Sequence, residues 1–197
     1  MKSMNINLRT FAALLILLAS QPSVAADGAL NVTGAITDAT CTVLGVISDS
    51  DIGTRQPQLS PVITLTNLSE NSNAVTAISQ FQIHLKGCYA SASQKNIRIK
   101  MTSPYADSYG KLALANAIRD GAKGKVVVLY ERNITSGGGG QFMPVGYGRS
   151  ATAWNDLPTT GDGIVRFGFT AVAQEAWQEI IAPGAFSTFV DYEMEYQ

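Results

Sequence analysis

Apolar and polar residues alternate with a period of two along several stretches of this chain. The apolar positions within 30–36, 81–85 and 97–99 are separated by polar ones, which is the pattern of strands with one buried face. The stretch 126–130 (VVVLY) is continuously apolar and rich in β-branched residues. It predicts a strand that is covered on both faces and central to the core.

Clusters of Gly, Ser, Asn and Asp separate these runs, at 48–51, 70–73, 137–140 and 161–163. Short strands between such clusters are typical of an antiparallel sandwich. Only the stretch 108–120 has mixed apolar spacing, which leaves a short helix open there. The sequence therefore predicts an all-β fold.

The alternation is most regular at the C-terminus. Every even position there is apolar or Thr, and the odd positions after Phe189 are Asp191, Glu193, Glu195 and Gln197. A shift of one residue would bury three carboxylates, so the register of this strand is predicted to be fixed. Its inward set is Phe186, Thr188, Val190, Tyr192, Met194 and Tyr196.

The N-terminus has the features of a secretory signal. Lys2 and Arg9 precede an uncharged apolar run at 11–19, and a small-x-small cleavage site follows at 23–25. The run is about half as long as a membrane-spanning helix requires, so we expect export without membrane insertion. We place the signal peptide at 1–25, with cleavage after Ala25 or Ala26, and the remaining length suits one domain.

Two cysteines, Cys41 and Cys88, are present. In an exported chain such a pair favours a disulfide over a metal or redox site. The alternative is two free thiols, although no basic residue flanks either one to make a reactive thiolate.

Charge and composition exclude several classes of function. Without residues 1–25 the chain has 12 basic and 15 acidic residues, a net charge near −3, which gives no reason to expect nucleic acid or an anionic membrane as partner. The single histidine, His84, lies on the polar side of a strand pattern and has no catalytic partner arrangement. We expect no metal and no cofactor.

Two further patterns have ordinary structural interpretations. Gly137 to Gly140 is not followed by the Lys-Ser/Thr of a phosphate-binding loop and is interpreted as a hairpin loop. Aromatic residues could line a sugar-binding cleft, but such residues more often serve packing. They are Trp154, Trp177, Tyr105 and Tyr147.

Taken together, several of these features resemble the subunits of chaperone–usher fimbriae, in particular the type 1 and type 3 pilin group. The C-terminal strand has a penultimate tyrosine, Tyr196, and Gly184 follows Pro183 fourteen residues from the end. An Ala-x-Cys element at 39–41 opens the domain, and 124–132 (GKVVVLYER) is similar to the family's central strand.

The resemblance implies an immunoglobulin-like β-sandwich that lacks its last strand and is completed by a donor strand from another chain. It implies a pilin domain at 37–197 whose groove strand contains Gly184 and the inward C-terminal set. Residues 26–36 would be an N-terminal donor-strand extension that lies outside its own sandwich and serves the next subunit. The sequence leaves open whether a free monomer complements itself. Its groove-facing positions are Gly28, Leu30, Val32 and Gly34.

The implied function is that of a structural, non-enzymatic subunit of a surface fimbria that supports cell adhesion. The implied partners are a periplasmic chaperone, an outer-membrane usher and neighbouring subunits, in a homopolymer. A minor adaptor, tip or terminator subunit with a receptor-binding role is the alternative, because only two residues separate Ala25 from Gly28. An exported β-sandwich enzyme is the remaining class.

Overall fold

The computed structural model is an all-β sandwich. It describes residues 28–35, 41–59, 62–65, 78–105, 113–134, 143–144, 151–176, 180, 182 and 184–197. The predicted signal peptide and the turn clusters at 70–73 and 137–140 lie outside these ranges, as do Pro183, Tyr147 and Trp177. In the part of the chain that is described, no helix is long and apolar enough to cross a membrane.

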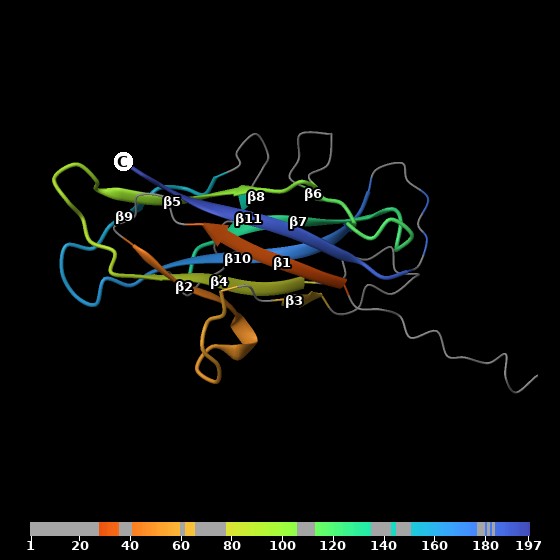
Figure 1. The fold of residues 1–197 in the computed structure, drawn as a ribbon, viewed down its shortest axis with the longest axis horizontal. Coiled ribbons are helices and arrows are strands. Elements are labelled where there is room, and N and C mark those ends of the chain that lie inside the picture. The colour runs from red at the N-terminus through yellow and green to blue at the C-terminus, as the bar shows by residue number, and fades with distance from the viewer. Residues whose placement is uncertain are drawn as a thin grey trace, which may run out of the picture.

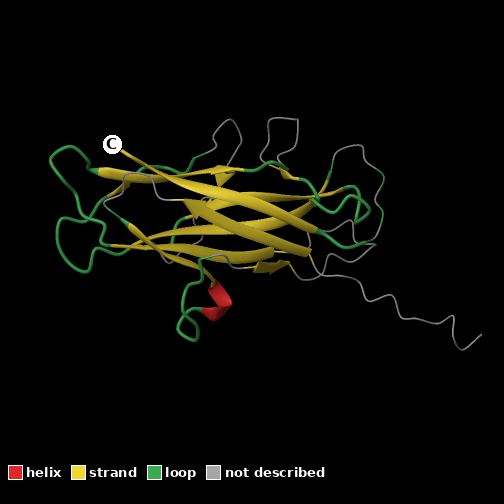
Figure 2. Ribbon diagram, viewed as in Figure 1, coloured by secondary structure: helices red, strands yellow, loops and turns green. Residues whose placement is uncertain are grey.

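The strands are short to medium in length and run in two layers (Figures 1 and 2). In chain order they are β1 (Gly28–Ala35), β2 (Thr42–Ser48), β3 (Val62–Leu65), β4 (Ile78–Lys86), β5 (Asn96–Thr102), β6 (Ala113–Leu114), β7 (Lys125–Arg132), β8 (Met143–Pro144), β9 (Asn155–Asp156), β10 (Val165–Glu175) and β11 (Ser187–Tyr196), with the 3-10 helix η1 at Asp49–Asp51.

The two sheets have the orders β3-β1-β11-β5-β9 and β2-β4-β10-β7-β6, and β8 pairs with β7. Among the described strands, all pairings are antiparallel except that of β1 with β11. Strands β1 to β5 alternate between the sheets, so the chain repeatedly crosses the core. The predicted all-β, immunoglobulin-like sandwich is thereby confirmed.

The core is formed by the inward residues of both sheets. Phe81 of β4 and Phe169 of β10 are fully buried neighbours whose ring centroids lie 5.4 Å apart. From the opposite sheet, Ile97 and Ile99 of β5 are also fully buried. The period of two predicted for β4 and β5 therefore places one apolar face of each strand in the interior.

One expectation from the sequence is corrected, and one open question is answered where the chain is described. Val127 and Leu129 of β7 are fully buried, but Val126, Val128 and Tyr130 are only partly buried, so β7 is not covered completely on both faces. A continuous apolar run specifies strand and burial without specifying how well the second face is covered. The stretch 108–120, where a short helix was left open, is not helical where it is described: 113–114 form β6, 115–118 have no regular secondary structure, and 119–120 form a turn.

Cys41 and Cys88 form a disulfide, as predicted, and both are buried. The bond joins the residue before β2 to the second residue after β4. The backbone N–H of Cys88 also donates to the carbonyl of Gly163 at 2.8 Å. The disulfide therefore holds the start of β2 at the end of the sandwich where β4 ends and β10 begins.

Replacing both cysteines with Ala should destabilise the exported chain by about 4 kcal/mol, because their sequence separation of 47 closes a long loop in the unfolded state. Urea unfolding monitored by fluorescence measures the difference. Reduced wild-type protein should match the double variant. A loss below about 1 kcal/mol would contradict this assignment of the disulfide's role.

Candidate functional site: the insertion site beside β11

The candidate site is the position between β11 and β3, which we call the insertion site. Strand β11 alternates as its sequence predicts: Val190, Tyr192 and Met194 are buried, while Asp191 and Glu193 are exposed. Thr188 and Phe186 are also buried, and Tyr196 is partly buried. Burial raises the pKa of Tyr192 because its phenolate would lose solvation.

The insertion site is filled by β1 of the same chain. Residues 29–35 pair in parallel with 187–193 of β11, and residues 28–31 pair antiparallel with 62–65 of β3. Leu30 and Val32 are 0% exposed, and Gly28 is buried. Figure 1 shows β1 lying alongside β11.

The sequence left open whether a free monomer fills its own insertion site, and the structure has it filled. The resemblance implied that residues 26–36 lie outside their own sandwich, whereas the structure places 28–35 inside it. The physical reason is that an apolar strand and an unpaired sheet edge in one chain can satisfy each other when the linker permits. The inward positions Gly28, Leu30 and Val32 agree with the predicted alternation, and Gly34 continues it at the pairing with Tyr192. Transfer of this strand to another subunit stays a prediction.

Few polar contacts reinforce the outer side of this pairing. The hydroxyl of Thr33 donates to a carboxylate oxygen of Asp191. The side-chain amide of Asn31 reaches the carbonyl of Thr188 only at 3.5 Å, which is a weak contact. Burial of Leu30 and Val32, at about 1.5–3 kcal/mol each, and the backbone ladder therefore dominate the attachment of β1.

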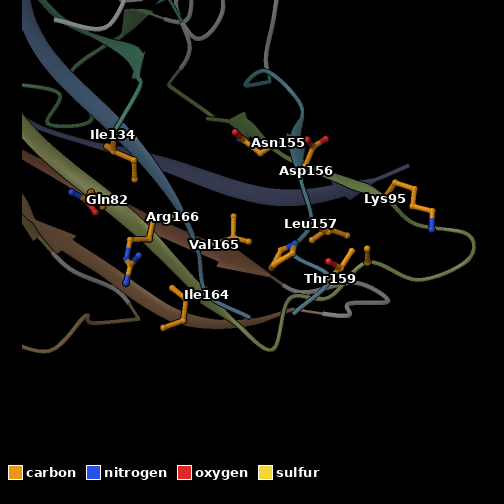
Figure 3. A pocket seen from close by; sticks show the side chains of 12 residues that line it. Gln82, Lys95, Ile134, Asn155, Asp156, Leu157, Thr159, Ile164, Val165 and Arg166 are labelled. Carbon is orange, nitrogen blue, oxygen red and sulfur yellow. The ribbon is translucent and has the colours of Figure 1, made fainter. Parts of the chain in front are cut away.

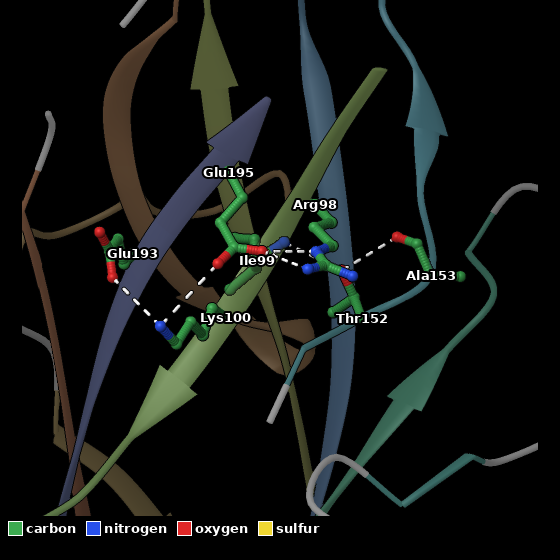
Figure 4. Close-up of polar contacts among 7 residues, drawn as sticks. All are labelled: Arg98, Ile99, Lys100, Thr152, Ala153, Glu193 and Glu195. Atoms are coloured by element: carbon green, nitrogen blue, oxygen red, sulfur yellow. Dashed lines mark hydrogen bonds and ion pairs between the residues drawn. The ribbon is translucent and has the colours of Figure 1, made fainter. Parts of the chain in front are cut away.

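Along the edge of β11 that pairs with β5, outward-facing charged residues of the two strands form a ladder (Figure 4). Arg98 lies 2.5 Å from Glu195, and Lys100 lies 3.9 Å from both Glu193 and Glu195. These pairs are partly exposed, so each contributes little to stability. They show that the predicted outward residues of β11 face the outer surface of the sheet.

The residues just before β11 approach a neighbouring turn closely. Gly184 has φ +154°, and a Cβ there would lie 2.7 Å from the backbone N of Ala122. Glycine is therefore required at this position by both space and conformation. The resemblance singled out Gly184, and the close backbone packing explains why glycine is needed there.

The other residues that the sequence analysis weighed as candidate sites make packing and hydrogen-bond contacts with their neighbours. His84 is partly buried and contacts Gln82 at 3.0 Å, and its pKa is lowered by burial and then by Arg166. Trp154 is stacked by the guanidinium of Arg98 at 4.4 Å, and Tyr105 packs on Phe189 near the opposite end of β11. These two aromatics therefore do not share a cleft. No group of three potential metal ligands occurs among the described residues.

A surface depression of about 1100 Å³ lies between β9 and the start of β10 (Figure 3). Leu157 and Val165 form its apolar floor, and Asp156 at its rim already accepts a hydrogen bond from Asn96 at 2.6 Å. Lys95 and Arg166 add cationic groups. The depression is open and mixed in character, so no single ligand chemistry follows from it.

Comparison with known proteins finds no matching family model and no matching curated protein. Among solved structures, the P pilus rod subunit PapA matches with 16% identity over 81% of this chain and 100% of that one, at a TM-score of 0.47. A Burkholderia pseudomallei antigen and type I fimbria protein matches with 21% identity over 80% and 91% of the two chains, at a TM-score of 0.40. Both TM-scores are below 0.5. The fold is therefore defined by its strand order and register and not by these matches.

Substituting Tyr192 or Met194 with Asp should prevent accumulation of folded protein, because either puts an uncompensated carboxylate at a side chain that is 3% exposed. The expected cost is several kcal/mol. The control Glu193→Gln changes an exposed neighbour on the same strand and should be nearly silent. Yield and urea midpoint are the measurements, and equal effects on both faces would refute the register.

Proposed function

We propose that this chain is an exported structural subunit of a bacterial surface fimbria, assembled by strand exchange through a chaperone and an usher. The observation that carries the proposal is the position of β1, the first described strand, in the middle of a sheet between β11 and β3. Without β1, β11 would have an unpaired backbone edge beside exposed apolar side chains. Such an edge recruits an extended strand from another chain.

The linker after β1 restricts how the chain can fill its own insertion site. Residues 36–40 join β1 to Cys41, and chain geometry limits the Cα distance from Ala35 to Cys41 to about 20 Å. Cys41 is bonded to Cys88, and backbone hydrogen bonds from Ala90 to Pro158, from Leu157 to Lys95 and from Lys95 to Gln197 place Cys88 at the Gln197 end of β11.

Insertion in the opposite direction would place Ala35 beside Ser187, at the other end of a strand about 33 Å long. The tether is too short for that, so β1 can enter its own site only in parallel. A strand from another molecule has no such tether and can enter in either direction. Antiparallel to β11 it would be parallel to β3, so the two directions exchange the geometry of the two pairings. The tether therefore restricts the direction of self-insertion and leaves that of a donor strand free.

In the proposed pathway a periplasmic chaperone protects the insertion site, and the neighbouring subunit's strand replaces it at an outer-membrane usher. The product is a fibre in which each subunit donates one strand and accepts another, and which supports adhesion. The proposal assigns the chain no catalytic step. Its chemistry ends with formation of the disulfide.

Leu30→Asp should abolish donation, because this side chain is 0% exposed in the insertion site and a carboxylate there costs several kcal/mol. Periplasmic co-expression with the chaperone should give heat-labile, detergent-resistant ladders for wild type and none for Leu30→Asp. The variant should persist as a chaperone-bound monomer. Asn31→Asp, which puts the same charge on the partly exposed outer side, is the matched control and should keep its ladders.

Mixing Leu30→Asp with wild-type protein distinguishes a variant that cannot donate its strand from one that cannot fold. Leu30→Asp retains its own β11 and β3, so it should accept a strand from wild type and shorten wild-type ladders in proportion to its amount. Long ladders containing the variant throughout would contradict strand donation by residues 28–35. Wild type that forms no ladder but terminates a fibre of another subunit would instead support the minor-subunit alternative.

A further inference from the structure

The hydroxyl of Thr188 is the unusual group at the insertion site. Thr188 is 0% exposed, and its Oγ1 makes no hydrogen bond within the part of the chain that the structure describes. Two other buried side-chain atoms there share this property, Nε of Arg132 and Oγ1 of Thr170, but both belong to the other sheet. Buried polar groups in native structures are almost always paired, so the hydroxyl of Thr188 needs an explanation.

Strand β1 covers this hydroxyl without bonding to it. Leu30 is paired with Thr188 in the ladder, and both residues are 0% exposed. The next inward side chain of β1 is Val32, which is also apolar and fully buried. The polar side chains of β1 nearest to this pair, Asn31 and Thr33, lie on its outer face. The self-inserted strand therefore removes Thr188 from water and offers its hydroxyl no partner.

Strand propensity does not explain a threonine at this position. Valine has a closely similar shape, is equally suited to strands and has no hydroxyl that must lose its water. Burying an unpaired hydroxyl lowers a folding or binding constant by about tenfold, whereas a hydroxyl that gains a hydrogen-bond partner contributes favourably. A threonine at position 188 is therefore suited to an inserted strand that bonds to it, and Leu30 does not.

We propose that Thr188 is a specificity-determining residue of the insertion site, and that it favours an extended strand of another chain with Ser or Thr at the position facing it. Neighbouring strands lie about 4.7–4.9 Å apart, and at this spacing paired Ser and Thr side chains hydrogen-bond across a sheet. The inference rests on the proposed function, because only exchange brings such a strand into the site.

The preferred donor therefore differs in sequence from this chain's own strand. The inward set of β1 is Gly28, Leu30, Val32 and Gly34, and it contains no hydroxyl. Reversing the direction of the strand does not change this, because burial of Leu30 and Val32 selects the same face in both directions. A second copy of this chain consequently fills the site but leaves the hydroxyl of Thr188 unpaired.

Paired substitutions in the full mature chain test this preference without any second chain. The tether holds β1 in the parallel direction, so residue 30 stays the neighbour of residue 188. Leu30→Thr and Leu30→Val put side chains of the same shape at this position, with and without a hydroxyl. Each is made with Thr188 present and in the Thr188→Val background, and urea unfolding measures the four folding constants.

With Thr188 present, Leu30→Thr should be at least as stable as Leu30→Val, because the two hydroxyls bond to each other. In the Thr188→Val background the order should reverse. There Leu30→Thr should have a folding constant about tenfold below that of Leu30→Val, because its hydroxyl is buried without a partner. Thr170→Val is the matched control, since it removes the unpartnered hydroxyl in the other sheet and should leave the difference between the two Leu30 variants unchanged.

Thr188→Val by itself gives a second readout. With Leu30 in place it should raise the urea midpoint, because it removes a hydroxyl that has lost its water and gained no partner. A lower midpoint would show that this hydroxyl is bonded in the folded chain, and it would overturn the proposal. This measurement decides alone if the Leu30 variants fail to fold.

An equal cost of the hydroxyl at position 30 in both backgrounds would also overturn the proposal. The fibre proposal fails separately, because it depends on polymer ladders and these unfolding measurements do not. Absence of ladders together with the reversed order of stability would reject the fibre proposal and leave the preference of the site in place. Ladders together with an unchanged order would reject only the preference for a hydroxyl.

Discussion

The pairing of β11 with β1 is the interaction on which the rest of the structure depends. β11 supplies buried apolar residues to the core and lies between β1 and β5 in its sheet. Buried backbone groups must be paired, and an open edge at this place would expose both the groups and the apolar side chains beside them. The sheet therefore requires a strand at this position, and this requirement does not specify which chain supplies the strand.

The chain meets this demand with its own residues 28–35, under a constraint set by five linking residues and the disulfide. The constraint fixes the direction of β1 as parallel. A donor without the tether is free to enter in either direction. The described sandwich has its insertion site filled by β1, and the fibre assembly proposed above requires that a strand from another chain replace it.

The inward and outward faces of β11 contribute differently to the structure. Its inner residues fix the face through burial, whereas the Arg98 and Lys100 pairs on its outer side are exposed enough to add little energy. The start of the strand is fixed differently, by Asn116 and two glycines that allow backbones to approach closely. The face and the direction of β1 consequently have separate physical origins in this protein, which are burial and tether length.

The sequence by itself determined the strand class, the inward face of β11, the inward positions of β1 and the pairing of Cys41 with Cys88. Each follows from local alternation or from the presence of only two cysteines. Only the tertiary structure decided that β1 lies in its own sandwich, because strand pairing depends on linker reach and on sheet order. It also decided the incomplete covering of β7 and the hydrogen bonds that the side-chain amide of Asn116 makes. The bonds of that amide extend to residues as far as 71 positions away in the chain, a separation that no local pattern encodes.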